Sequence, residues 1–384
     1  MSSVKSHKTV YVGMSGGVDS SVAAALLKKQ GFNVVGVFMK PWQPNHETWN
    51  LKLETQKNDS RFKIQDSCLW QQDREDALRA AGVLGIPLLT WDFSKQYKKS
   101  VTDYMIREYK AGRTPNPDVM CNKEIKFGLF LKQALKEGAD YIATGHYVRL
   151  RRKIEHSGLR ITNSKIRNPQ SAIFELHTAK DKNKDQSYFL WTLTQEQLKY
   201  CVFPIGDYTK PEVRKLAKRF KLPNHDKKDS QGVCFIGPLD MKEFLLKYIK
   251  PRSGKVIHKD GRVLGKHDGV YYYTIGQRHG LNLGIAGGPY YVVGKDIKKN
   301  IIYVGKDGDA VCKDAKVSNT NWCTMAPIVQ GSVDVKVRYR ARSVKAFLNR
   351  EGILKFKKPE RAVTSGQSAV FYKGQRLLGG GIIL

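Results

Sequence analysis

The chain has 384 residues, enough for two or three domains that each bury a core of their own. Hydrophobic residues make up 41% of it, and no apolar run approaches the roughly 20 residues of a membrane span, so we expect a globular protein with no membrane partner. Lys and Arg number 67 against 35 Asp and Glu, and the net charge of +32 indicates a surface for a polyanion such as nucleic acid. The alternative explanation of this charge is a general preference for lysine, without any nucleic-acid site.

The first predicted elements form a strand–loop–helix–strand unit. A buried strand at Thr9–Gly13 precedes a glycine-rich turn, a helix over Asp19–Gln30 and a second strand at Asn33–Met39. Residues 41–67 are polar without a clear period and predict a mobile loop or insertion. The alternation then resumes. Helices are predicted at Asp73–Leu84, Ser94–Ala111 and Lys123–Glu137, and strands at Pro87–Phe93 and Ala139–Tyr147. This pattern predicts a doubly wound α/β domain that binds ligands at the carboxyl ends of its strands.

The second half of the chain changes character. Residues 148–168 are polar and basic, which indicates a solvated β-hairpin or loop, and residues 207–250 look helical, with Pro211 at the start of one helix. From about Lys255 onward, short alternating segments separated by Gly-rich turns predict an all-β region. Strands are expected at Gly269–Ile275, Tyr290–Val293, Ile301–Val304, Val333–Tyr339 and Ser368–Tyr372.

The turn Ser15-Gly16-Gly17-Val18-Asp19-Ser20 carries the strongest local signal. A glycine-rich turn between a strand and a helix offers backbone N–H groups and a positive helix end to phosphate. The lysine of a Walker loop is absent, so the turn better suits release of whole pyrophosphate from ATP, with Asp19 able to hold Mg²⁺. A tight turn with a serine N-cap is the alternative.

Six cysteines occur in the chain: Cys68, Cys121, Cys201, Cys234, Cys312 and Cys323. None forms a C-x-x-C pair, and no Cys/His cluster has zinc spacing, so we expect no metal centre of this kind. No secretory leader is evident before residue 9, which favours a cytoplasmic protein with reduced thiols.

Two of these cysteines lie in segments suited to chemistry. Cys121 follows the proline-stiffened stretch Asn116–Asp118 and precedes a helix expected from Lys123, whose dipole and lysines would favour a thiolate. Asp118 is close enough along the chain to carry a proton or to orient a partner. Cys234 follows a polar stretch in which Lys227 and Lys228 would lower the pKa of its thiol. A buried structural cysteine is the alternative at both positions.

The glycine-rich turn resembles the PP-loop of the adenylating ATP pyrophosphatases, which have a Rossmann-like sheet. With further blocks in one order, the chain resembles the bacterial tRNA-specific 2-thiouridylase family along essentially its whole length. The blocks are Gly13–Ser21, Ala111–Lys126, Ala143–Tyr147, Lys184–Leu190, Asp229–Gly237, Thr274–Gly280 and Thr364–Tyr372. The resemblance implies a monomer with a catalytic PP-loop domain at 1–206, a central tRNA-binding domain at 207–277 and a C-terminal β-barrel at 278–384.

The resemblance also implies a reaction. ATP with Mg²⁺ would adenylate the C2 oxygen of the wobble uridine in tRNA, and a persulfide on Cys234 would deliver sulfur to C2. Delivery would be direct or as sulfide freed when Cys121 attacks, with Asp118 assisting proton transfer. A cysteine desulfurase or sulfur relay protein would supply the sulfur. Whether Cys121 and Cys234 form a disulfide bond at rest stays open.

The implied ligand contacts fall into two groups. ATP would be held by Gly13, Met14, Ser15, Gly16, Gly17, Val18, Asp19, Ser20, Met39 and Gly145. tRNA would be contacted by Asn116, Pro117, Asp118, His146, Lys184, Asp185, Gln186, Tyr339, Arg340 and Gln367. The alternative for His146 is an ordinary capping histidine. For the other tRNA positions outside 116–118, the alternative is a solvated polar side chain without a role in tRNA binding. For the whole chain, the competing functions are a PP-loop amide synthetase that uses ammonia and a binding module that has lost catalysis.

Overall fold

The computed structural model describes residues 8–42, 69–154, 172–229, 232, 234, 240–281, 283, 288–324 and 330–384. Most of the predicted loop at 41–67 lies outside these ranges. The chain divides into two compact units. Unit 1 comprises Met1–Ser100, Glu124–His146 and Tyr200–Pro238, and unit 2 comprises Val101–Lys123, Tyr147–Lys199 and Leu239–Leu384.

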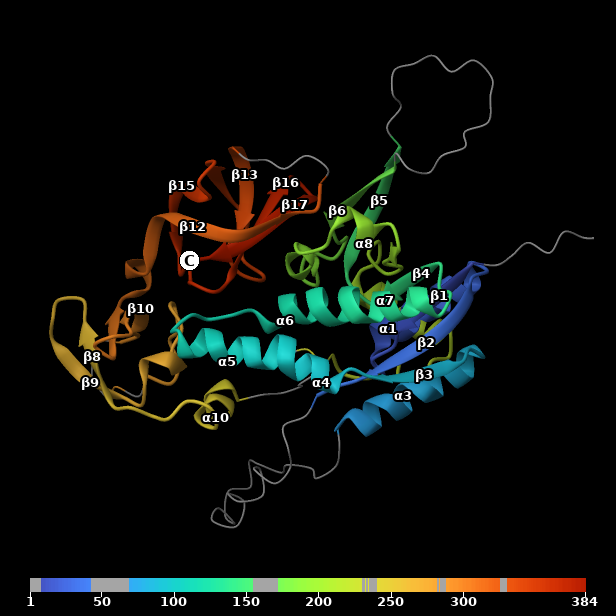
Figure 1. The fold of residues 1–384 in the computed structure, drawn as a ribbon, viewed down its shortest axis with the longest axis horizontal. Coiled ribbons are helices and arrows are strands. Elements are labelled where there is room, and N and C mark those ends of the chain that lie inside the picture. The colour runs from blue at the N-terminus through green and yellow to red at the C-terminus, as the bar shows by residue number, and fades with distance from the viewer. Residues whose placement is uncertain are drawn as a thin grey trace, which may run out of the picture. The chain divides into compact units, whose positions relative to one another are not determined.

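The described part of unit 1 contains a five-stranded parallel sheet. Its strands are β1 (Thr9–Gly13), β2 (Asn33–Lys40), β3 (Leu88–Asp92), β4 (Tyr141–Thr144) and β7 (Cys201–Val202). The order across the sheet is β3-β2-β1-β4-β7, so the direction of winding reverses at β1 (Figure 1). This topology confirms the predicted Rossmann-like α/β domain.

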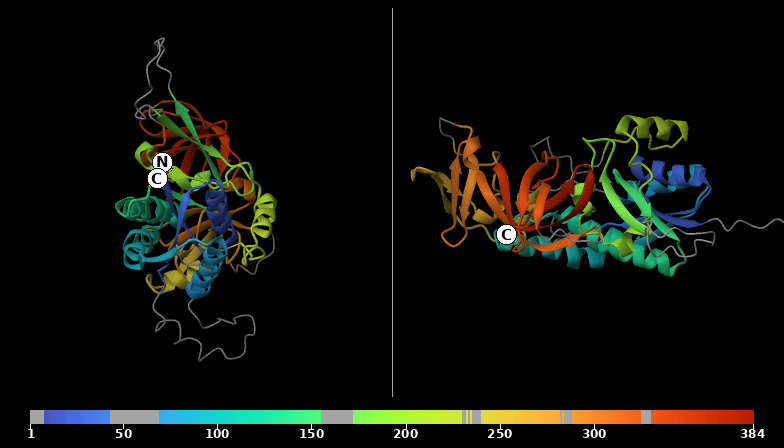
Figure 2. Two further views of the ribbon diagram at one scale, coloured as in Figure 1. Left: turned by 90° about the vertical axis from the view of Figure 1, so that its right-hand side faces the viewer. Right: turned by 90° about the horizontal axis from the view of Figure 1, so that it is seen from above.

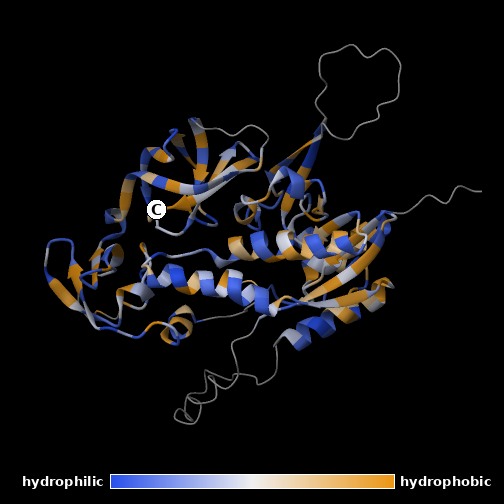
Figure 3. Cartoon of the chain, in the orientation of Figure 1, coloured by the Kyte–Doolittle hydropathy of each residue, from blue (hydrophilic) through white to orange (hydrophobic). Residues whose placement is uncertain are grey.

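Burial explains why the strands of unit 1 read as apolar runs. Val10, Val12 and Val37 have no exposed surface, because a parallel sheet is covered on both faces. Helix α1 (Val18–Lys29) follows β1 and presents small buried residues such as Ala23 and Ala24. Figure 3 shows hydrophobic colour along β1 and β2, and mixed colour on α3 (Leu69–Leu84).

Two predicted helices differ in detail from the observed ones. The one expected at Ser94–Ala111 is α4 (Ser94–Tyr97), a π-helical turn at Lys98–Thr102 and α5 (Asp103–Lys110). The one expected from Lys123 begins at Pro117, as α6 (Pro117–Met120), a π-helical stretch at Cys121–Leu129 and α7 (Phe130–Lys136). The prediction was wrong about this start because Asn116 caps the helix and proline is well tolerated in the first turn.

Unit 2 contains a closed antiparallel barrel (Figure 2). Its strands are β12 (Val311–Trp322), β13 (Gly331–Lys336), β14 (Val344–Leu348), β15 (Ile353–Arg361), β16 (Ser368–Lys373) and β17 (Arg376–Ile383). They follow the order β12-β15-β14-β13-β16-β17, and pairing of β12 with β17 closes the ring. The barrel encloses a hydrophobic core in which Val335, Leu354 and Phe371 have no exposed surface. The predicted C-terminal β-barrel is confirmed.

A hairpin extends the barrel sheet. Strand β5 (Val148–Ile154) pairs with β6 (Ala172–Thr178), and β6 meets β17 where His177 is opposite Arg376. The hairpin predicted over 148–168 is therefore present in its first strand, while its second strand lies further along the chain. Short helices follow at Ser187–Leu190 (3₁₀) and Gln195–Leu198 (α8).

A four-stranded sheet lies between the helical region and the barrel in sequence. Its order is β10 (Tyr291–Asp296), β11 (Ile301–Gly305), β8 (Gly254–His258), β9 (Val263–His267). It takes strands from both sides of residue 277, and the domain limits at 206 and 277 stay predictions. A 3₁₀ turn at Asp307–Asp309 follows β11.

Two expectations for this region have different outcomes. The strand expected at Gly269–Ile275 is wrong, because Val270–Tyr272 forms a 3₁₀ turn in which the Val270 N–H donates to Asn300 Oδ1 (3.1 Å). The expectation of helices with Pro211 near a start is confirmed by α9 (Lys210–Arg219). Helix α10 (Met241–Leu246) follows in unit 2.

Candidate active site

The turn between β1 and α1 is shaped by its own backbone and hydroxyls. Gly16 has a φ of +75°, and a Cβ there would lie 2.1 Å from the carbonyl oxygen of Asp73. The Ser20 hydroxyl accepts from the Ser15 N–H (3.2 Å) and donates to the Gly17 carbonyl oxygen (3.1 Å). The turn is therefore held at the N-terminal end of α1, where a helix attracts anions.

The other predicted nucleotide residues lie around this turn. β1 and β4 are neighbours, so their carboxyl ends meet where the winding reverses, which is the usual ligand site of such sheets. A Cβ on Gly145, directly after β4, would lie 2.7 Å from the Ser20 nitrogen. A Cβ on Gly13 would lie 3.1 Å from Met39 Cε. Unit 1 thus brings the predicted ATP residues together, although ATP binding by each stays a prediction.

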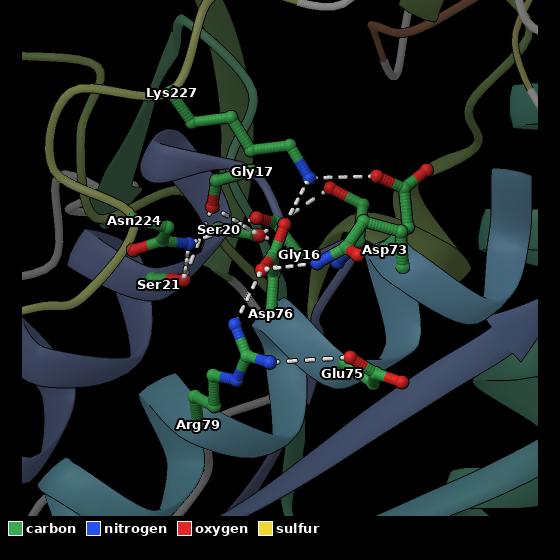
Figure 4. A network of polar contacts seen from close by, with 12 residues as sticks. Gly16, Gly17, Ser20, Ser21, Asp73, Glu75, Asp76, Arg79, Asn224 and Lys227 are labelled. Atoms are coloured by element: carbon green, nitrogen blue, oxygen red, sulfur yellow. Dashed lines mark hydrogen bonds and ion pairs between the residues drawn. The ribbon is translucent and has the colours of Figure 1, made fainter.

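Asn224 contacts this turn and was missed by sequence analysis. Its side-chain NH₂ donates to the Gly16 carbonyl oxygen (2.8 Å) and to the Ser21 hydroxyl (3.0 Å), and the residue is 5% exposed. Figure 4 shows Asn224 directed at the turn. Because about 200 positions separate these partners, no local pattern around Asn224 could have indicated the contact.

Lys227 binds carboxylates on α3 (Figure 4). Its Nζ lies 2.7 Å from Asp73 Oδ1 and 2.6 Å from Asp76 Oδ2. Burial lowers the pKa of Lys227 while its hydrogen bonds to the two carboxylates raise it, and the net direction is upward. The ammonium of Lys227 is therefore engaged by α3, and its expected effect on the thiol of Cys234 stays a prediction.

Asp19, expected to hold Mg²⁺, is engaged by Lys210. The Lys210 ammonium donates to both carboxylate oxygens of Asp19, at 2.8 and 2.9 Å. It also lies 2.8 Å from Asp229 Oδ1. In the described ranges, no three His, Cys, Asp or Glu side chains are grouped as metal ligands.

Cys234 is partly exposed and its backbone is bound within unit 1. The carbonyl oxygen of Cys234 accepts a hydrogen bond from the Tyr97 hydroxyl at 2.5 Å. Tyr97, on α4, is fully buried. A residue of the α/β core therefore helps to fix the position of Cys234.

His146 lies in the interior of unit 1. It is 5% exposed, its Nδ1 lies 2.7 Å from the Thr144 hydroxyl, and its ring packs against Phe127 and Phe203. Burial and the charge of Lys126 keep the pKa of His146 well below its ordinary value, so the ring is neutral. Its predicted contact with RNA stays a prediction, and this burial does not support it.

In unit 2, Asn116, Pro117 and Asp118 form the start of a helix. Asn116 Oδ1 accepts from the Val119 N–H (3.2 Å), and Asn122 Nδ2 donates to the Asp118 carbonyl oxygen (3.0 Å). Cys121 follows within the helix and has no exposed surface. The expectation that Cys121 precedes the helix is therefore corrected: it lies after the first turn, where the influence of the dipole is weaker.

The chain leading into this helix is bound by the β-regions of unit 2. Gln367 Nε2 donates to the carbonyl oxygens of Thr114 (2.9 Å) and Pro115 (3.1 Å). The Thr114 N–H donates to the Ser365 carbonyl oxygen at 2.9 Å. Lys295 Nζ donates to the Gly112 carbonyl oxygen at 2.8 Å. Gln367, predicted to contact tRNA, thus has its amide group on the segment before Asn116.

The residues predicted at 184–186 differ in accessibility. Asp185 is buried and accepts from the Ser187 hydroxyl (3.0 Å) and from Lys336 Nζ (3.2 Å) on β13. Gln186 Oε1 accepts from the Tyr147 N–H at 2.9 Å. Lys184 is half-buried. Asp185 and Gln186 therefore order the loop internally, and contact of this trio with tRNA stays a prediction.

Tyr339 and Arg340 pair a ring with a cation. The ring of Tyr339 packs on Phe189 with a centroid distance of 4.4 Å, and the Arg340 guanidinium lies 5.3 Å from the Tyr339 ring centroid. Arg340 is exposed and has a φ of +61°. An exposed arginine beside a partly exposed ring suits phosphate contact and base stacking.

The predicted residues divide between the two units. Unit 1 carries the glycine-rich turn, Met39, Gly145, His146 and Cys234, and unit 2 carries Asn116–Cys121 with the remaining tRNA positions. Neither Cys121 nor Cys234 takes part in a disulfide bond among the residues that the structure describes. Within the part of the chain that the structure covers, no helix is long and apolar enough to cross a lipid bilayer.

Comparison with known proteins bears on the whole chain. Residues 8–238 match the family model described as the tRNA methyl transferase HUP domain. Residues 242–306 match the tRNA methyl transferase PRC-barrel domain, and residues 313–383 match the aminomethyltransferase beta-barrel domain. Together the three matches follow the α/β sheet, the four-stranded sheet and the barrel.

Curated relatives match over nearly their full length and are named for sulfur chemistry rather than methyl transfer. The tRNA-specific 2-thiouridylase MnmA of Bacillus licheniformis is 45% identical over 97% of this chain and 94% of that protein. Its counterpart in Bacillus subtilis is 44% identical over 97% and 94%, and that of Listeria monocytogenes is 42% identical over 100% and 96%. Among solved structures, NMN synthetase from Francisella tularensis aligns with a TM-score of 0.32 at 14% identity over 62% of this chain and 72% of that chain, too low to argue from.

Proposed function

Because this chain belongs to the tRNA-specific 2-thiouridylase family, we propose that it uses ATP and a persulfide to convert a tRNA uridine to 2-thiouridine. The observation that carries the proposal is the turn at Ser15–Ser20. It lies at the N-terminal end of α1, where the sheet reverses its winding. The family indicates the class of substrate, and the turn supports ATP as the reactant that activates it.

The ATP-dependent half of the reaction is adenylation. The C2 oxygen of the wobble uridine attacks the α-phosphorus of ATP, a P–O bond forms, and pyrophosphate leaves. The turn supports this step because Gly16 and Gly17 let backbone N–H groups approach phosphate and no lysine of the Walker type is present. Mg²⁺ would accompany the phosphates of ATP, and Asp19 is the carboxylate that the turn itself contains.

The sulfur half uses the two cysteines. Persulfide on Cys234, loaded by a cysteine desulfurase or sulfur relay protein, supplies the sulfur that replaces AMP at C2. Attack of the Cys121 thiolate on Cys234 Sγ breaks the S–S bond, before or after the sulfur reaches C2. Either order leaves a Cys121–Cys234 disulfide that an external thiol must reduce. Asp118, in the first turn of the helix that carries Cys121, assists proton transfer.

Recognition of tRNA rests on unit 2. The net charge of +32 suits a polyanion, and Arg340 with Tyr339 offers a cation beside a ring. Asn116 and Pro117 set the start of the helix that leads to Cys121, and we propose that this turn surrounds the target base.

The test is formation of 2-thiouridine in vitro. The protein is incubated with unmodified tRNA, ATP, Mg²⁺ and a persulfide donor, and the digested tRNA is examined for 2-thiouridine. Cys121→Ser and Cys234→Ser should each abolish the product and leave tRNA binding largely unchanged. The buried Cys201→Ser is the matched control for loss of a thiol. Product from Cys234→Ser would refute the assigned sulfur relay, and ATP consumption that needs ammonia would favour an amide synthetase.

A further inference from the structure

Lys210 is the first residue of α9 and bridges two carboxylates from distant parts of the chain. Its ammonium contacts both oxygens of Asp19, at 2.8 and 2.9 Å, and Asp229 Oδ1 at 2.8 Å. Asp19 lies in the first turn of α1, and the Lys210 side chain is 11% exposed. One ammonium therefore joins the glycine-rich turn to the segment that leads to Cys234.

Charge explains why this bridge matters for a nucleotide. Arg214, one turn further along α9, contacts the same Asp229 oxygen at 3.1 Å, so two cations balance two carboxylates. Without Lys210, Asp19 would lose this ammonium, and more of its negative charge would face the phosphates of ATP. Removing one partner of a partly buried ion pair is costly, because the remaining charge stays desolvated.

The chain on either side of Asp229 is bound to the same unit at further points. Asn224 binds the turn, Lys227 binds α3, and the Tyr97 hydroxyl binds the backbone of Cys234. Asp229 therefore lies between Asn224, which contacts the nucleotide turn, and Cys234, which contacts the α/β core. A change at Lys210 acts on this part of the chain.

We propose that Lys210 is a positioning residue that couples ATP binding to the exposure of Cys234. When ATP binds, the ammonium turns toward the phosphates beside α1 and loosens its hold on Asp229, so Cys234 becomes more reactive. Lys210 thus supplies, from α9, the phosphate-facing lysine that the glycine-rich turn does not contain. The inference rests on the proposed function in taking ATP as the ligand of the turn.

The test measures nucleotide affinity and thiol reactivity in the full-length protein, without tRNA or sulfur. The probe is α,β-methylene ATP with Mg²⁺, and alkylation of Cys234 by iodoacetamide is followed by mass spectrometry of its peptide. In the unsubstituted protein, the nucleotide should accelerate alkylation several-fold. Lys210→Met should weaken nucleotide binding about tenfold, as loss of a charge-assisted hydrogen bond predicts, and should alkylate rapidly whether or not nucleotide is added.

Three further variants make the result specific. Lys210→Arg, which keeps the charge, should recover part of the affinity and of the nucleotide response. Tyr97→Phe should raise the alkylation rate of Cys234 without changing nucleotide affinity. Lys218→Met removes an exposed lysine from the same helix and should change neither quantity. Circular dichroism and the unfolding midpoint establish that each variant is folded.

The outcomes separate this inference from the proposed function. A folded Lys210→Met variant that binds the nucleotide normally, or keeps the nucleotide response of Cys234, would overturn the role of Lys210 and leave the proposed function intact. Failure of the unsubstituted protein to bind the nucleotide would refute the proposed function itself.

Discussion

At the scale of the residue, glycines in this chain differ in whether the surrounding structure leaves room for a side chain. Gly16 combines a left-handed backbone with a close approach to the backbone of Asp73, so no side chain fits. Gly82, within α3, has nothing within 4 Å of the position that a Cβ would take. The same substitution should therefore have opposite effects at the two sites.

Gly16→Ala should destabilise the protein by about 1–3 kcal/mol, because it adds backbone strain and a clash with Asp73 that must shift α3 or the turn. It should also abolish ATP binding. Gly82→Ala should stabilise the protein by about 0.5–1 kcal/mol, since alanine is the better helix former. Urea unfolding and ATP titration measure both effects. Equal stabilities of the two variants would contradict the geometry described for Gly16.

At the scale of the element, the helix that carries Cys121 is positioned from outside its own sequence. Asn116 caps it, while Gln367, Ser365 and Lys295 bind the carbonyl and N–H groups of residues 112–115. Gly366 has a φ of +91°, and a Cβ there would lie 2.8 Å from the Thr114 carbonyl oxygen. The turn at 365–367, just before β16, therefore packs on the chain that leads into the helix.

Gln367→Ala should lower the rate of thiolation more than the affinity for tRNA. The substitution leaves the carbonyl oxygens of Thr114 and Pro115 without this donor, so the turn at Asn116 loses its fixed position, at a cost of about 1–2 kcal/mol in stability. Single-turnover kinetics and a filter-binding assay separate the two quantities. A loss confined to tRNA affinity would show instead that Gln367 acts by direct contact with tRNA.

At the scale of the whole molecule, charge is the dominant property. A net charge of +32 over 384 residues raises the rate and strength of association with any polyanion, whatever its sequence. Selection of one uridine must then come from local groups such as those around Asn116, because a general field cannot distinguish bases.

Affinity for tRNA should fall by about a hundredfold or more between 50 and 200 mM salt, as expected when several phosphates are neutralised. Fluorescence anisotropy with labelled tRNA over a salt series gives the slope. Arg340→Ala should make the slope shallower by roughly one phosphate contact. A shallow slope for the unsubstituted protein would favour the alternative that the lysine content has no nucleic-acid role.

The sequence by itself determined the elements whose signals are local. The strand at Thr9–Gly13, the turn after it and the helix that follows were predicted closely, because apolar runs, glycines and helical spacing act over a few residues. The start of the helix expected from Lys123 and the strand expected at Gly269–Ile275 were wrong. In both places, capping and hydrogen bonding competed with the pattern, through Asn116 in one case and the distant Asn300 in the other.

Only the tertiary structure decided the surroundings of the site. The bridge from Lys210 to Asp19, the contact of Asn224 with Gly16 and the bond from Gln367 to Thr114 each join residues far apart in the chain. Hydrophobic and helical periodicity reports which face of an element is buried, but not which element lies against it. A polar side chain finds a distant partner only after the sheet and barrel have formed, and so its role cannot be deduced from its neighbours in sequence.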